Sequence, residues 1–474
     1  MITPAPPTTG HTQSDQPPAA GLSGRPAGIL ITSLLLGVLS FQLNASMVTP
    51  ALPRIGEHFG AVPADVAHVQ SMFFLAGAIA GPVVGRWSDF IGRRTALLLV
   101  LAVMAAGTLL CLAAPTLPVL VAGRFLQGAS SAVFALSYMV LKENLHPRSF
   151  GTSVGVVAAV NGGVAGLDGY AGGLMTETLG FRSIFVVVLL LAAVAVLCIL
   201  KTVPAGRPTG AGERMDWWGA AALSVFFVCL SSFVSAGSAS GWGSPGSLAL
   251  LGATAASFAA FWALEKRRSS PLIAVHQLRS RQVWPVIATT VLALAGLFAI
   301  MNFTVVLLSQ DSATGFGLSA SLSALLFLTP AALIGVFAAP LAGWLAGRRG
   351  WVMALRLGTG LSLACAAGAA LFAQHQWAVL VCVAALGVFY NGFFLTAING
   401  LSVLLSPREA PGALPGINGA SFGIGASLGV VLVAPFAGQG TEAGYSTALW
   451  ISVAITAAAF LVSLLVPAPQ QDDR

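Results

Sequence analysis

Two ionisable side chains stand deep inside apolar stretches of this sequence. Asp168 lies within the stretch Gly151–Met175, and Arg124 lies within Leu117–Val140. Charged groups inside a membrane are costly and mark ion or proton pathways. A carboxylate can bind and release a proton, whereas a guanidinium keeps its charge. We therefore expect proton chemistry at Asp168, with Arg124 as the charge that faces it.

The predicted depths of these two residues coincide if their helices are straight. Asp168 lies roughly 25 Å above Gly151 at 1.5 Å per residue, and Arg124 lies roughly 10 Å below Leu117, which starts at the other face. In an apolar core about 30 Å thick these levels nearly meet. Asn44, in a third stretch, reaches the same layer. We expect a pair that exchanges partners; a static ion pair, or no contact, are the alternatives.

These residues must be positioned by helices, because the chain is too apolar for a water-soluble domain. It is 57% hydrophobic and 8% charged, and soluble domains carry about 25% charged residues. Fourteen stretches approach the length of about 20 apolar residues that crosses a bilayer. They are Ala27–Met47, Val69–Trp87, Thr95–Ala114, Leu117–Val140, Gly151–Met175, Ile184–Leu200, Trp218–Gly237, Leu248–Leu264, Val283–Leu308, Ser319–Leu345, Val352–Ala373, Trp377–Leu404, Leu414–Gly438 and Ala448–Val466. An all-α membrane protein follows.

The basic residues are distributed unequally between the two sides of these stretches. With the N-terminus placed inside, eighteen Lys and Arg residues fall on the cytoplasmic side, and Arg54 and Arg182 fall on the other. Cytoplasmic loops carry such an excess, so both termini are expected in the cytoplasm, with the protein in the plasma membrane. The net charge of +7 is then a topology signal, and nucleic acid is not expected as a partner.

Two longer loops, Thr202–Asp216 and Glu265–Gln282, divide the stretches as six, two and six. The expected organisation is a disordered cytoplasmic tail over residues 1–26, a six-helix bundle over 27–201, and a linker with two extra membrane helices over 202–282. A second six-helix bundle over 283–466 and a cytoplasmic tail over 467–474 complete the chain.

One loop carries a family signature. Gly85-Arg-Trp-Ser-Asp89-Phe-Ile-Gly92-Arg93-Arg94 resembles the loop between helices 2 and 3 of the major facilitator superfamily, and a degenerate copy starts at Gly343 in the second half. The resemblance implies the major facilitator fold, here two six-helix bundles plus two inserted helices. It also implies that the first loop stabilises the state closed to the cytoplasm, with Gly85, Asp89, Gly92, Arg93 and Arg94 as gate residues. Basic anchors beside a tight turn are the alternative.

Further motifs narrow the resemblance. Leu43-Asn-Ala-Ser-Met-Val-Thr-Pro-Ala-Leu52-Pro53, Arg124-Phe-Leu-Gln127-Gly128 and Asp216-Trp-Trp-Gly219 are similar to elements of the fourteen-helix drug:proton antiporters, a multidrug efflux family. Two departures stand out. The family's acid on helix 1 is Asn44 here, and its Gly-Pro-x-x-Gly-Gly pattern on helix 5 becomes Asp168-Gly-Tyr-Ala-Gly-Gly173. Asp168 would then replace the charge that Asn44 lacks.

Six polar or aromatic residues within the stretches are the candidates for a substrate cavity. They are Asn44, Gln127, Tyr138, Asn302, Tyr390 and Asn391. Each can instead form hydrogen bonds between helices. With so few buried acids, a neutral or singly charged amphipathic substrate fits better than a multivalent cation.

Other classes of function lack their motifs. The sequence has no Gly-x-x-x-x-Gly-Lys-Ser/Thr for ATP, no Ser/His/Asp set and no metal-ligand spacing, so we expect no enzyme, no cofactor and no metal. The predicted function is a monomeric secondary transporter that exports a small drug-like compound or metabolite, with protons as the coupled partner. A uniporter, an importer and a non-transporting membrane sensor are the alternatives.

Overall fold

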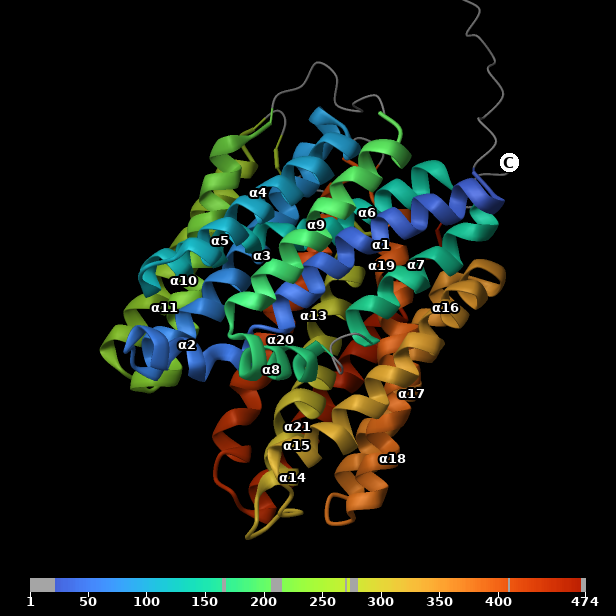
Figure 1. Cartoon of the computed structure of the whole chain (residues 1–474). Coiled ribbons are helices and arrows are strands. Elements are labelled where there is room, and N and C mark those ends of the chain that lie inside the picture. The colour runs from blue at the N-terminus through green and yellow to red at the C-terminus, as the bar shows by residue number, and fades with distance from the viewer. Residues whose placement is uncertain are drawn as a thin grey trace, which may run out of the picture.

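The computed structural model describes residues 22–163, 168–205, 215–268, 271–272, 280–407 and 410–469. These residues are almost entirely helical (Figure 1), and the one isolated β-bridge joins Leu22 to Leu145. The first bundle contains α1 Gly24–Ser46, η1 Thr49–Ala51, α2 Leu52–Phe59, α3 Pro63–Ile91, α4 Arg93–Ala113, α5 Leu117–Gly128, η2 Ala129–Ser131, α6 Ala132–Asn144, α7 Pro147–Gly163, α8 Asp168–Leu179 and α9 Arg182–Thr202. The segments η1 and η2 are 3₁₀-helical.

A helical hairpin and a second bundle follow. The hairpin is α10 Trp217–Ser240 and α11 Pro245–Glu265. The second bundle contains α13 Trp284–Ala299, η4 Ile300–Thr304, α14 Val305–Gln310, α15 Ala320–Ser323, η5 Ala324–Leu328, α16 Thr329–Arg349, α17 Trp351–Leu371, α18 Gln376–Leu386, η6 Gly387–Phe394, α19 Leu395–Leu404, α20 Ala413–Ala437 and α21 Glu442–Ser463. Here η4, η5 and η6 are π-helical.

Thirteen helices within the described residues are long and apolar enough to cross a membrane. The fourteenth predicted stretch, Gly151–Met175, falls on α7 and α8, and residues 164–167 between them lie outside the described part of the chain. The described residues of this stretch are helical on both sides of these four positions. Backbone groups in lipid must be satisfied within a segment, which is why these apolar stretches form helices.

The two bundles repeat one local device where one membrane helix ends and the next begins. Gly92 separates α3 from α4 with φ 85°, and Gly350 separates α16 from α17 with φ 108°. Residues with a Cβ atom rarely adopt a positive φ, so glycine is the residue that permits each turn. Since the first glycine belongs to the signature loop and the second to its degenerate copy, the sequence echo is also a structural repeat.

The bundles meet along two seams. In the first seam α3 packs against α20, and in the second α7 packs against α16; Figure 1 shows the second pair side by side. Glycines line both seams: Gly85 faces Gly412 across the first, and Gly151 faces Gly343 across the second. Small residues let membrane helices approach closely, which explains the tight contact.

The inserted hairpin covers one seam only. Leu223 and Phe227 of α10 and Phe261 of α11 share an apolar cluster with Leu75 of α3 and Ala420 of α20. In Figure 1, α10 and α11 lie on the side of the molecule away from α7 and α16. The hairpin therefore shields the first seam and leaves the second uncovered.

Candidate functional site

Arg124 is the centre of a buried polar cluster in the first bundle, and its side chain is fully enclosed. The guanidinium donates to the backbone and side-chain oxygens of Asn44 at 3.0 and 2.7 Å and to Gln127 at 2.9 Å. It also donates to Gln70 at 3.2 Å and to the carbonyl of Val69 at 3.1 Å. Five hydrogen bonds thus hold one buried charge, and every acceptor is neutral.

The end of α1 explains why a cation is stable at this depth. The last carbonyls of a helix have no partner within it and carry partial negative charge. Arg124 donates to the carbonyl of Asn44, and Gln70 donates to the carbonyl of Ala45 at 2.7 Å. The guanidinium carbon of Arg124 lies 4.2 Å from the centre of the Phe73 ring. Arg124 therefore caps α1 where no water can do so.

Gly128 completes the Arg-x-x-Gln-Gly motif by letting helices approach. A Cβ atom at Gly128 would collide with the carbonyl oxygen of Phe73 on α3. Close contact between α3 and α5 is what brings Gln70 and Val69 within reach of Arg124. The motif is therefore a packing element as well as a source of charge.

Asp168 is nearly buried, with 3% of its surface exposed, and lies in the first turn of α8. Its carboxylate accepts a hydrogen bond from the hydroxyl of Ser46, on the last turn of α1. Asp168 and Arg124 thus both hold the last turn of α1, at Ser46 and Asn44.

The expected direct pair between these charges is absent from this conformation. Among the described residues, Arg124 makes no ion pair, because all of its hydrogen-bond acceptors are amide or backbone oxygens. The depth estimate placed Arg124 beside Asn44, and the structure joins them. The described partner of Asp168 is instead Ser46, two residues beyond Asn44 on α1.

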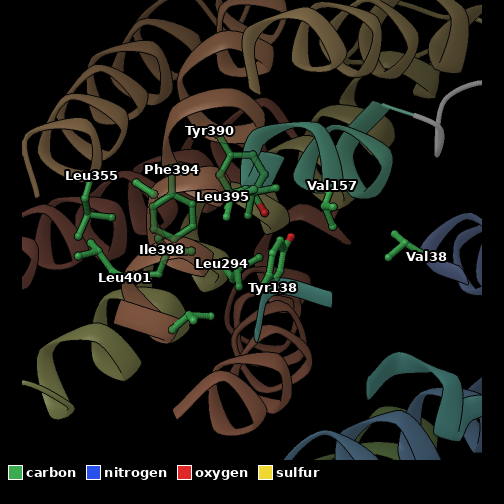
Figure 2. Packing of buried hydrophobic residues seen from close by; sticks show 14 of the residues in the cluster. Val38, Tyr138, Val157, Leu294, Leu355, Tyr390, Phe394, Leu395, Ile398 and Leu401 are labelled. Atoms are coloured by element: carbon green, nitrogen blue, oxygen red, sulfur yellow. The ribbon is translucent and has the colours of Figure 1, made fainter. Parts of the chain in front are cut away.

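A second group of candidates lies between the bundles. Figure 2 shows Tyr138 of α6 and Tyr390 of η6 with their hydroxyl groups pointing toward each other. Both are buried, and the Tyr138 hydroxyl has no hydrogen-bond partner within the described structure. The Tyr138 hydroxyl therefore keeps both its donor and its acceptor capacity.

The second-bundle candidates share a backbone irregularity. Asn302 lies in η4, and Tyr390 and Asn391 lie in η6, so all three fall in π-helical segments. Such segments interrupt α-helices frequently at functional sites. Asn302 is exposed, whereas Asn391 is buried and donates to the carbonyl of Ala331 at 3.4 Å. The six candidates therefore divide between the Arg124 cluster, the tyrosine pair, the buried Asn391 and the exposed Asn302.

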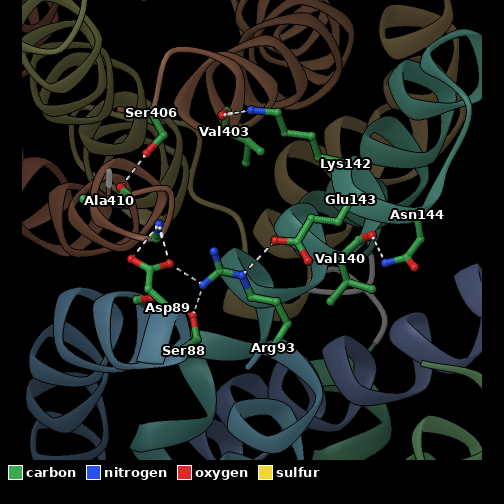
Figure 3. Close-up of polar contacts among 12 residues, drawn as sticks. Ser88, Asp89, Arg93, Val140, Lys142, Glu143, Asn144, Val403, Ser406 and Ala410 are labelled. Atoms are coloured by element: carbon green, nitrogen blue, oxygen red, sulfur yellow. Dashed lines mark hydrogen bonds and ion pairs between the residues drawn. The ribbon is translucent and has the colours of Figure 1, made fainter. Parts of the chain in front are cut away.

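The signature loop forms the best-connected polar cluster (Figure 3). Asp89 is buried and pairs with Arg86 at 3.0 Å and Arg93 at 2.6 Å. Its carboxylate also accepts the backbone N–H of Gly412, 3.1 Å away, just before α20 begins. This last bond joins the two bundles, so the cluster closes the first seam at this end of the molecule, which we call the Asp89 end.

The remaining gate candidates have different positions. Arg93 reaches Glu143 on α6 at 3.1 Å, and Gly92 forms the turn before α4. Arg94 instead donates to the carbonyl of Leu200 at 2.6 Å, at the end of α9 in its own bundle. Arg94 is therefore outside the contact between the bundles.

Two residues that take part in these polar contacts were not identified from the sequence. Lys142 donates to the carbonyl of Val403 on α19 at 2.8 Å and so links the bundles at the Asp89 end. Ser46 binds Asp168. Lys142 had been counted only as a topology signal, and a lone serine near a helix end carries no recognisable pattern. The two-residue spacing of Ser46 from Asn44 was the only hint.

Several known proteins are similar to this chain. The uridine/deoxyuridine transporter of Lactococcus lactis is 34% identical over 92% of this chain and 94% of its own length. The tetracenomycin C resistance and export protein of Streptomyces glaucescens is 28% identical over 88% of this chain and 77% of its own. The crystal structure of the human organic anion transporter MFSD10 (TETRAN) matches with a TM-score of 0.64 and 16% identity, covering 93% of this chain and 100% of that one.

The family model described as Major Facilitator Superfamily matches residues 34–426. The match begins within α1 and ends within α20, so it takes in most of both bundles and the hairpin between them, and the structure has the fold that the signature loop implied. The relatives are named as a transporter and an export protein, and these names favour a multi-pass membrane transporter over an enzyme. The chain belongs to the Major Facilitator Superfamily.

Proposed function

We propose that this chain is a proton-coupled secondary transporter of a neutral, nucleoside-like molecule in the plasma membrane. The Asp89 end faces the cytoplasm under this proposal, as do both termini. The relative at 34% identity is named a uridine/deoxyuridine transporter, and its match extends over nearly the whole of both chains. A nucleoside carries an aromatic base and several hydroxyl groups, so it needs stacking surfaces and neutral hydrogen-bond partners.

The observation that carries this proposal is the tyrosine pair between the bundles. Tyr138 comes from the first bundle and Tyr390 from the second, and the Tyr138 hydroxyl is buried without a partner. Aromatic faces stack on planar rings, and a free hydroxyl can bind a base or a sugar. A ligand held by both residues would touch both bundles, so its binding would change as the bundles move.

Proton coupling is assigned to Asp168. Its carboxylate holds Ser46, while Arg124 holds Asn44 two residues earlier on α1. Protonation would weaken the charge-assisted bond from Ser46, because a neutral carboxyl is a poorer acceptor. The last turn of α1 would then be released from α8 while Arg124 keeps its hold. Asp168 and Arg124 thus act on one helix end, without needing a direct ion pair.

Export of a drug-like compound by proton antiport is the second candidate. It is favoured by the similarity to the tetracenomycin C export protein and by the Arg-x-x-Gln-Gly motif around Arg124. Asn44 in place of the family's acid weighs against it, since Asn44 serves here as an acceptor for Arg124. A neutral substrate has less need of that acid.

The test is flux in proteoliposomes that contain the full chain. Radiolabelled uridine and a lipophilic cation such as ethidium are each measured with an imposed pH difference of either sign, and without one. We expect saturable uridine flux that the pH difference accelerates in one orientation. Driven ethidium flux without uridine flux would select the drug exporter instead. Uridine flux indifferent to pH would indicate a uniporter, and binding without flux a sensor.

Tyr138→Phe separates substrate binding from folding. Removing a buried hydroxyl that has no partner should leave the thermal stability unchanged or slightly higher. If the hydroxyl binds substrate, KM for uridine should rise by about fivefold, the equivalent of about one hydrogen bond. Phe134→Leu, which alters a neighbouring aromatic side chain without a hydroxyl, is the control. An unchanged KM in Tyr138→Phe would remove the tyrosine pair from the site.

A further inference from the structure

A cavity opens at the Asp89 end of the second seam. Its volume is about 450 Å³, and it is lined by Arg148, Trp344, Gly347 and Arg348. Arg148 belongs to the first turn of α7, in the first bundle, and Arg348 to the last turn of α16, in the second. The cavity therefore lies between the two bundles, with one arginine from each.

The equivalent place in the first seam holds a carboxylate. Gly85 and Asp89 of the signature loop correspond to Gly343 and Gly347 of its copy, since each pair is four residues apart and each first glycine packs across its seam. In the first seam Asp89 forms ion pairs with Arg86 and Arg93. In the second seam the matching residue is Gly347, which has no side chain to offer.

The arginines of the cavity consequently have no internal counter-ion. Within the described residues, neither Arg148 nor Arg348 lies within ion-pair distance of a carboxylate. Arg348 instead stacks on Trp344, with its guanidinium carbon 4.2 Å from the ring centre. Arg148 lies at a helix start, where the backbone favours an anion and disfavours a cation. The site thus favours a negative group supplied from outside the protein.

The surface next to the cavity indicates which anion this is. Phe337, Leu341 and Trp344 of α16 are 73%, 65% and 45% exposed, and Arg348 follows at the same helical spacing. Residues three and four apart share one face of a helix, so an apolar stripe on α16 ends at a charged head. The hairpin shields the other seam, so this stripe is open to lipid. An acyl chain can lie along the stripe with its phosphate in the cavity.

We propose that this cavity binds the phosphate of an anionic phospholipid, such as phosphatidylglycerol, between Arg148 and Arg348. Arginine recognises phosphate through paired N–H groups, and both arginines face the same cavity. Because they come from different bundles, the bound phosphate takes the part that Asp89 plays in the other seam. A ligand that binds one conformation better shifts the population toward it. The lipid therefore stabilises the conformation closed at the Asp89 end.

Binding of dioctanoyl phosphatidylglycerol to the purified full chain, in a neutral detergent, tests the proposal by native mass spectrometry. The double variant Arg148→Gln/Arg348→Gln should weaken binding by about tenfold or more, since it removes two charge-assisted contacts. Arg349→Gln is the matched control: it removes the same charge from the next residue of α16, which does not line the cavity. That variant should bind like the unaltered chain.

Gly347→Asp provides a second, independent arm. A Cβ atom at Gly347 would meet only the Cα of Gly151, 3.9 Å away, so the helix can accept a side chain. The new carboxylate should supply the missing counter-ion and displace the lipid, whereas Gly347→Ala should leave binding intact. Equal binding by the unaltered chain and the double arginine variant would overturn the site. Inorganic phosphate competing as well as the lipid, at equal concentration, would overturn the lipid assignment.

Discussion

The two bundles share one plan but stabilise their interiors with different chemistry. The first places a buried guanidinium, Arg124, among neutral amide and carbonyl acceptors. The second has a neutral chain in which Thr290 donates to Asn418 at 2.7 Å and Asn418 donates to Asn399 at 3.1 Å. The first bundle also contains Asp168, while the π-helical segments η4, η5 and η6 all lie in the second. Within the described residues, these buried charges and the π-helical segments therefore lie in different bundles.

This segregation suggests a division of labour. A proton acts on a charged group, and the buried charges hold the end of α1 in the first bundle. A substrate that is neutral needs adaptable polar and aromatic contacts, and these are found in the π-helical segments of the second. The tyrosine pair takes one residue from each bundle. We infer that coupling between proton and substrate passes through the movement of one bundle against the other.

The seams differ in the same sense. The first is closed by Asp89, which joins arginines of its own loop to the N–H of Gly412, and the hairpin covers it. The second lacks both the acid and the cover, and two arginines face a cavity there. The repeated loop keeps its glycines in both bundles but has the acid only in the first. The arginines of the first seam are therefore paired within the protein, whereas those of the second seam face a cavity.

The comparison is tested most severely by removing the central residue of each polar cluster. Arg124→Leu leaves the acceptors of Asn44, Gln70 and Gln127 buried without this donor, at about 1–3 kcal/mol for each unsatisfied acceptor, so it should destabilise the fold and abolish transport. Asn418→Leu breaks two neutral bonds, and hydrogen bonds between membrane helices average about 0.6 kcal/mol. Thermal unfolding of both purified variants should show a several-fold larger loss for Arg124→Leu. Equal losses would contradict the distinction between a charged and a neutral bundle.

Asp168→Asn should have the next largest effect, confined to coupling. The variant keeps an acceptor for Ser46 but can no longer bind or release a proton. We expect substrate accumulation driven by a pH difference to be lost, while exchange of labelled for unlabelled substrate at equilibrium continues. Ser46→Ala is the matched partner change, and it should weaken coupling less because the carboxylate remains. Full pH-driven accumulation by Asp168→Asn would exclude Asp168 as the proton site.

The sequence was sufficient for the fold and for part of the site. Hydropathy located the helices because a membrane span must be both long and apolar, and counting 1.5 Å per residue placed Arg124 level with Asn44. The same count did not predict Ser46 as the partner of Asp168, since it compared depths only with Arg124 and Asn44. The signature loop predicted Asp89 and Arg93 as gate residues, and in the structure Asp89 pairs with Arg93 and accepts the N–H of Gly412 across the seam.

Other features of the site have no sequence signal. A π-helical segment such as η6 changes the backbone hydrogen-bond pattern without changing composition, so hydropathy cannot detect it. The role of Lys142 depends on which carbonyl lies opposite it, and Val403 is 261 residues away in the chain. The unsatisfied hydroxyl of Tyr138 is a property of packing alone. Geometry, and not residue type, distinguishes these residues from their neighbours.

The smallest expected effect concerns Asp311 of the second bundle, which lies in a loop and not inside a membrane-spanning helix. Asp311, in the loop after α14, accepts hydrogen bonds from the backbone N–H of Ala313, the hydroxyl of Thr314 and the hydroxyl of Tyr445. These bonds favour the charged form and lower the pKa of Asp311 from its ordinary value of 3.8 to about 2. Its stabilising contribution is therefore complete above about pH 4 and is lost as the pH falls toward 2.

Asp311 is consequently ionised throughout the range in which transport is measured. Asp311→Asn should leave the pH profile of transport between about pH 5 and 8 unchanged, with only a slight loss of thermal stability at neutral pH. That loss should shrink when unfolding is repeated at progressively lower pH, because the unaltered carboxyl becomes protonated as well. A pH profile displaced by Asp311→Asn, but not by Asp168→Asn, would place proton coupling in the second bundle and reverse the division of labour.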